Sequence, residues 1–67
     1  MSLNWICVYS AGFIYKVEIA KAVLADNGID SVIVNKQDSS YLVGDVELHV
    51  HPDDAVQAIQ IIETEKL

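Results

Sequence analysis

Arginine is absent from this chain, and its four lysines stand against ten acidic residues, which gives a formal net charge of −6. Proteins that bind nucleic acid neutralise phosphates with lysine and arginine, and anionic membrane surfaces attract the same side chains. We therefore expect neither nucleic acid nor a membrane as a partner. The acidic balance is typical of a protein kept soluble in the cytosol by its charge.

Cysteine is almost absent too, because Cys7 is the only one. This excludes an internal disulfide and a metal site made of cysteines alone, and it suits a reducing compartment. The N-terminus lacks the basic and apolar segments of a signal peptide, and no apolar run approaches the ~18 residues of a membrane span. We predict a cytoplasmic protein and interpret residues 1–3 as a cloning remnant.

The length allows one domain, residues 1–67. A chain this short buries only about 60% of the surface that it exposes when unfolded, so its core is small. Yet 52% of the residues are hydrophobic. We therefore expect part of the apolar surface to be buried between subunits, in a homodimer or a higher homo-oligomer.

Hydrophobic periodicity predicts three strands and two helices. Strands are expected at 5–9, 30–34 and 45–50, and helices at 13–27 and from Pro52 onward. The first helix should begin at an N-cap, Ser10, and end at a left-handed Gly28. Its apolar stripe is expected to contain Phe13, Val17, Ala20 and Leu24. The stripe of the second helix is expected to contain Val56, Ile59 and Ile62, with Ala55 and Ala58.

The order strand–helix–strand–strand–helix is typical of the split βαβ arrangement of ferredoxin-like folds. We predict an α+β domain with a three-stranded antiparallel sheet and both helices on one face. The third strand should lie between the other two. The first strand is then an uncovered edge, and such edges tend to pair with another chain.

Alternation along the strands assigns side chains to the two faces of this sheet. The face under the helices should receive Ile6, Val8, Val32, Val34, Val46, Leu48 and Val50. The opposite face should then show Trp5, Cys7, Tyr9, Ile33, Glu47, His49 and His51. An exposed apolar patch marks an interaction site, so we interpret this face as a subunit interface. Two alternatives remain: a platform for a ligand or partner, or core residues if the register is shifted by one.

Glu47, His49 and His51 alternate along one strand, and His-x-His is a spacing found in metal sites. Cys7 would approach His49 if the first and third strands are neighbours. The chain has no third histidine and no cysteine pair, so we expect no bound metal or cofactor, with His49 and His51 as the candidates otherwise. A Cys–His nucleophile would need an orienting group and an oxyanion hole. We identify neither, and predict no catalytic residues and no enzyme activity.

The segment 35–44 joins two antiparallel strands but is longer than a hairpin requires. It is rich in hydrogen-bonding and turn-forming residues: Asn35, Lys36, Gln37, Asp38, Ser39, Ser40, Tyr41 and Gly44. One interpretation is a loop that binds a partner or ligand. The other is a wide structured turn, in which Asp38 and Ser39 bond to the local backbone.

Several segments together resemble a known bacterial family. They are the segment 18–24, the turn Asn27-Gly28-Ile29, the segment 35–41, and Gly44-Asp45-Val46-Glu47-Leu48. On these residues the chain resembles, from Trp5 to about Ile62, a small domain family labelled "putative prokaryotic signal-transducing protein". The resemblance implies a ferredoxin-like shape, distantly similar to the PII nitrogen-regulatory proteins.

In PII proteins the loop between the second and third strands meets partners and carries a modifiable tyrosine, and Tyr41 lies in the matching loop here. This loop is much shorter, however, and the chain lacks both the fourth strand and the basic cluster that binds nucleotide phosphates. The resemblance therefore implies no nucleotide cofactor. It favours a non-enzymatic regulatory or adaptor module that binds a protein partner through residues 35–44. The alternative is a small-molecule or metal sensor.

Overall fold

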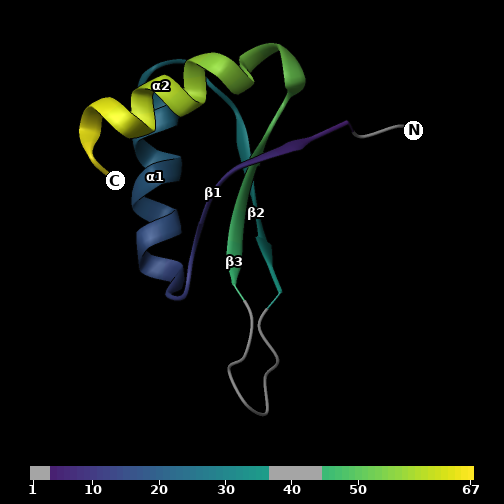
Figure 1. Ribbon diagram of the computed structural model, residues 1–67, viewed down its shortest axis with the longest axis vertical. Coiled ribbons are helices and arrows are strands. Elements are labelled where there is room, and N and C mark those ends of the chain that lie inside the picture. The colour runs from purple at the N-terminus through teal and green to yellow at the C-terminus, as the bar shows by residue number, and fades with distance from the viewer. Residues whose placement is uncertain (1–3, 37–44) are drawn as a thin grey trace.

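The computed structural model describes residues 4–36 and 45–67. Its elements follow the predicted order: β1 (Ile6–Ala11), α1 (Ile14–Asp26), β2 (Ser31–Asn35), β3 (Val46–Val50) and α2 (Ala55–Glu65) (Figure 1). A single 3₁₀ turn, Pro52–Asp54, leads into α2. Among these residues no helix is both long enough and apolar enough to cross a membrane.

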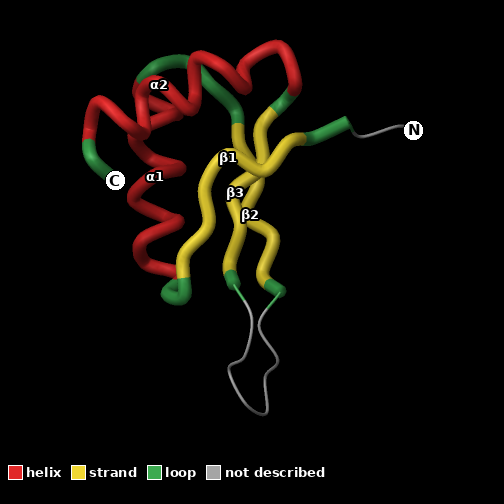
Figure 2. The backbone as a smooth tube through the Cα atoms, viewed as in Figure 1, coloured by secondary structure: helices red, strands yellow, loops and turns green. Residues whose placement is uncertain are grey.

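The three strands form one antiparallel sheet in the order β1-β3-β2. Helices α1 and α2 lie together on one side of it (Figure 2). The predicted α+β, ferredoxin-like βαββα arrangement is therefore confirmed, with β3 in the centre and β1 and β2 at the edges. The face of the sheet that the helices do not cover is called the open face below.

The core lies between the helices and the covered face of the sheet. Its buried residues are Val17, Ala20, Leu24 and Ile29, then Val46, Leu48 and Val50 of β3, and Ala55, Ala58 and Ile62 of α2. The alternation of β3 was read correctly, because its three valine and leucine side chains all point to the helices. The stripe Val17, Ala20, Leu24 was also correct, whereas Phe13 is exposed.

The end of α1 has a clear local cause. Gly28 takes a left-handed conformation with φ +78°, which costs glycine little because it has no Cβ. The Ile29 amide then donates to the Leu24 carbonyl at 2.9 Å, and the Gly28 amide donates to the Ala25 carbonyl at 3.0 Å. This is the Schellman pattern of helix ends. The predicted N-cap was wrong: Ser10 lies within β1, and Phe13 holds the N-cap position without a side-chain cap.

A β-bulge in β1 corrects the predicted position of Tyr9. Cys7 pairs with His49 on β3, but Tyr9 pairs with Leu48, so Val8 is an extra residue in the ladder. Directly paired residues share a face, so Tyr9 follows Leu48 to the core side. Both Val8 and Tyr9 pack against the core. Cys7, before the bulge, stays on the open face as predicted.

The faces of β2 are shifted by one residue from the prediction. Ile33 pairs with the buried Leu48, whereas Val32 and Val34 pair with His49 and Glu47. Ile33 therefore packs against the core, and the two valines lie on the open face. Three consecutive apolar residues carry no alternation, so the sequence did not mark the inward one, and a slip of one residue exchanges the faces.

The stripe of α2 also differs from the prediction. Ala55, Ala58 and Ile62 are buried as predicted, but Val56 is 70% exposed and Ile59 is exposed as well. Small alanine side chains let the helix lie close to its neighbours, and this places the larger valine and isoleucine outside.

Candidate functional site

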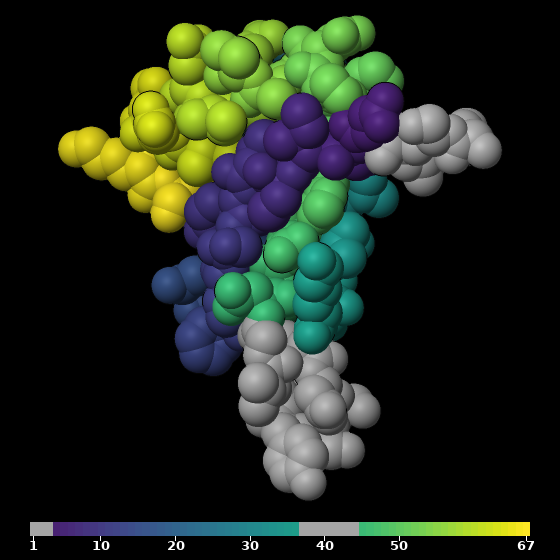
Figure 3. Space-filling view, turned by 45° about the vertical axis from the view of Figure 1, so that its right-hand side comes forward, coloured from purple at the N-terminus to yellow at the C-terminus, as the bar shows by residue number. Residues whose placement is uncertain are grey.

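The open face carries the residues that this fold leaves available for contact. On β3 it presents Glu47 and His49, with Cys7 of β1 on one side and Val32 and Val34 of β2 on the other. Figure 3 shows the three strands side by side at the surface, with α2 above them and part of α1 at the lower left. Apolar and polar groups on this face form two adjacent features.

The apolar feature is a shallow hollow of 530 Å³ lined by Trp5, Val32, Val34 and His49. Val32 is 44% exposed, which is high for a β-branched residue in a strand. The Trp5 ring meets the His51 ring edge-on, with centroids 5.8 Å apart. The hollow therefore exposes aromatic and aliphatic surface to solvent, the kind of surface that marks interaction sites.

The polar feature is a cluster around Glu47. His49 Nε2 donates a hydrogen bond to Glu47 Oε1 at 2.8 Å, and Lys36 Nζ lies 3.4 Å from the same oxygen. The side chains of His49 and Glu47 are only 20% and 22% exposed. The Cys7 thiol joins them from β1: the ligand atoms of Cys7, Glu47 and His49 all lie within 4.8 Å of one another.

These contacts lower the pKa of the Glu47 carboxyl below its usual value. The hydrogen bond from His49 is the largest cause, and the hydrogen bond and positive charge of Lys36 add to it. Partial burial acts in the opposite direction, because it disfavours the charged form. The net result is a carboxylate that stays ionised on a partly apolar surface.

The structure separates the two histidines that the sequence suggested as a pair. β3 ends at Val50, so His51 lies outside the strand, and its side chain is 60% exposed with Nδ1 3.8 Å from Asp53 Oδ2. His49 instead meets Cys7 across the strands, as the sequence anticipated for neighbouring first and third strands. Glu47 is the third residue of this cluster. Its spacing of two residues from His49 is the sequence pattern that indicates a shared face of the sheet.

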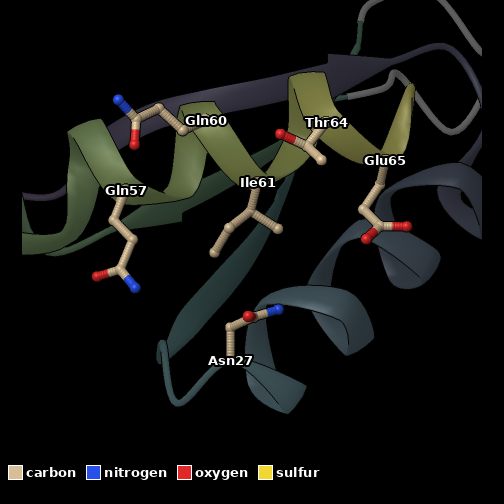
Figure 4. Close-up of a pocket in the computed structure, with 6 residues that line it drawn as sticks. All are labelled: Asn27, Gln57, Gln60, Ile61, Thr64 and Glu65. Atoms are coloured by element: carbon tan, nitrogen blue, oxygen red, sulfur yellow. The ribbon is translucent and has the colours of Figure 1, made fainter.

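A second hollow, of 280 Å³, lies between the end of α1 and α2 (Figure 4). It is lined by Asn27, Gln57, Gln60, Ile61, Thr64 and Glu65. The Asn27 amide is engaged locally, because it donates to the Val23 carbonyl at 2.9 Å. The lining resembles ordinary helix surface and lacks the mixture of apolar and ligand-type groups found on the open face.

Of the predicted partner loop, only Asn35 and Lys36 belong to the described residues. The Lys36 amide donates to the Asp45 carbonyl at 3.1 Å and so extends the pairing of β2 and β3. Gln37, Asp38, Ser39, Ser40, Tyr41 and Gly44 lie outside the described residues, and their predicted role stays a prediction.

Comparison with known proteins supports one relationship. Residues 5–66 match the model of a family described as "Putative prokaryotic signal transducing protein". No curated protein and no solved structure gives a match.

Proposed function

The chain belongs to the family described as "Putative prokaryotic signal transducing protein", and we propose that it is a non-enzymatic regulatory module that acts by protein contact. Its contact surface is the open face, and its first partner there is a second copy of the chain. The module works in the cytoplasm, in line with its single cysteine and acidic charge.

The observation that supports this proposal most is the apolar hollow formed by Trp5, Val32 and Val34 beside an edge strand. The helices bury the other face of the sheet completely at Val46, Leu48 and Val50. Within residues 4–36 and 45–67 the open face holds apolar surface in contact with water, and a partner chain would remove it from water. Burial of such surface stabilises association by about 25 cal/mol per Å² before the costs of binding.

Charge does not prevent two open faces from meeting. The net charge of −6 is not concentrated there, since Glu47 is paired with Lys36 and His49. The edge strands β1 and β2 border the same surface, and sheet edges favour contact between chains. The predicted contact of residues 35–44 with a protein partner remains part of the proposal.

The test is the solution mass, measured by size-exclusion chromatography with light scattering over a range of protein concentrations. We expect a dimer that Val32→Lys converts to a monomer. Val56→Lys is the matched control, because Val56 is an exposed valine on the outer side of α2. It should leave the dimer intact, and circular dichroism should show both variants folded.

A wild type that stays monomeric at every concentration would refute self-association through the open face. Equal dissociation by Val32→Lys and Val56→Lys would also contradict the proposal, because a general effect of added positive charge would then explain the result.

A further inference from the structure

We propose that Cys7, Glu47 and His49 form a binding site for a divalent cation of borderline softness, of which Zn²⁺ is the best match. The site uses one thiolate, one carboxylate and one imidazole from two neighbouring strands. It goes beyond the proposed function, because cation binding does not require a second protein chain.

The fold brings the three side chains together by simple strand geometry. Glu47 and His49 are two residues apart on β3 and so point to the same face. Cys7 is the direct partner of His49 on β1, and side chains of direct partners lie close together. The bulge begins immediately after Cys7, so it leaves this pairing intact while the rest of β1 is shifted.

The spacing of the ligand atoms fits a tetrahedral cation after small movements. Zn²⁺ bonds of about 2.0–2.3 Å place neighbouring ligand atoms about 3.5 Å apart. The three atoms here lie within 4.8 Å of one another, so side-chain rotations that move an atom by about 1 Å close the site. The thiol of Cys7 is exposed, which leaves its rotation unobstructed.

The donor set selects the class of cation. Ca²⁺ and Mg²⁺ prefer oxygen ligands throughout, whereas a set of sulfur, nitrogen and oxygen suits Zn²⁺ and its neighbours among the transition metals. Three protein ligands leave a fourth tetrahedral position for water on the solvent side of the sheet. The proposed site therefore keeps one coordination position that no protein ligand occupies.

Among the described residues, Lys36 is the cation paired with Glu47, and its charge opposes binding. Its Nζ lies 3.4 Å from Glu47 Oε1, but the side chain is 58% exposed. It can therefore turn into solvent when a divalent cation replaces it, because exposed ion pairs are weak. The chain's net charge of −6 further favours the approach of a cation.

A purely structural role explains this cluster less well. The Glu47–His49 pair could exist for strand pairing alone. The Cys7 thiol donates a hydrogen bond to the Tyr9 carbonyl at 3.5 Å, but thiols are weak donors, and this bond does not explain why the thiol lies beside the carboxylate and the imidazole. Cation binding accounts for all three groups at once.

The experiment titrates the wild-type protein with Co²⁺, a spectroscopic substitute for Zn²⁺, and then displaces it with Zn²⁺. We expect one equivalent to bind with tetrahedral Co²⁺ absorption and a thiolate-to-metal charge-transfer band. Cys7→Ser and His49→Gln should each weaken binding more than about 100-fold, because loss of an outer-shell partner alone costs 10–100-fold. The matched control His51→Gln should bind as the wild type does.

Lys36→Met provides a test in the opposite direction, since removal of the competing charge should strengthen binding. Absence of the charge-transfer band, or equal weakening by His49→Gln and His51→Gln, would overturn the proposal. A second chain and the cation would share the open face, so the titration is made at several protein concentrations alongside the solution mass. A charge-transfer band in a protein that stays monomeric would refute self-association alone, and a dimer that shows no band in its monomeric or dimeric form would refute cation binding alone.

Discussion

Replacing Ile33 by alanine should destabilise the protein far more than the same change at Val32, its neighbour in the chain. Ile33 packs against the core opposite Leu48, whereas Val32 is 44% exposed on the open face. Truncating a fully buried isoleucine to alanine costs 2–5 kcal/mol. Ile33 is only partly buried, so we expect about 2 kcal/mol. For Val32→Ala we expect about 0.5 kcal/mol, the usual size of a surface change.

Urea denaturation followed by circular dichroism would measure both values. Small proteins lose about 1 kcal/mol of stability per molar urea, so the midpoint should fall by about 2 M for Ile33→Ala and by about 0.5 M for Val32→Ala. The measurement should be made at two protein concentrations, because an effect through self-association varies with concentration. A Val32→Ala midpoint as low as that of Ile33→Ala would refute the register of β2 described above.

Two further predictions concern single groups. Because its partners lower the pKa of Glu47 below 4.5, the stability that this carboxylate contributes is present above pH 4.5 and is lost as the pH falls through the lowered pKa. His49→Gln should move the pKa back toward 4.5 in an NMR titration of the carboxyl, and an unchanged value would contradict the assigned cause. Gly28→Ala should cost about 1–2 kcal/mol in thermal or urea unfolding, through its positive φ alone, because an added Cβ meets nothing within 4 Å. Gly12→Ala, which is equally unobstructed but lies outside the left-handed region, is the control and should be close to neutral.

The order of elements and the centre of the sheet could be predicted because each rests on a local signal. Val46, Leu48 and Val50 alternate strictly with polar residues, which fixed the faces of β3. Gly28 marked the end of α1 because few other residues adopt its conformation without strain. The proximity of Cys7 to His49 could also be predicted, because placing β3 in the centre of the sheet makes it the neighbour of β1.

Two of the errors arise where the sequence offers more apolar residues than one face can hold. Val32-Ile33-Val34 can face either way, and only pairing with β3 decides it. In α2 the predicted stripe contained both Ala55, Ala58 and Ile62 and the larger Val56 and Ile59, and helical spacing alone did not separate the two sets. The structure buries the alanines, because close packing of the helix outweighs the burial of extra methyl groups at these positions.

The bulge at Val8 has a consequence for how β1 can vary in evolution. Before the bulge, the Cys7 side chain lies on the open face. After it, the side chains of Tyr9 and Ala11 pack against the core. A strand of the same length without the bulge would place Tyr9 on the open face and move its hydroxyl away from the Leu67 carbonyl, 3.3 Å distant. Removal of Val8 alone would instead leave Cys7 opposite His49 and Tyr9 opposite Leu48. Homologous chains can therefore differ in length by this one residue and still keep Cys7 on the open face and Tyr9 on the core side.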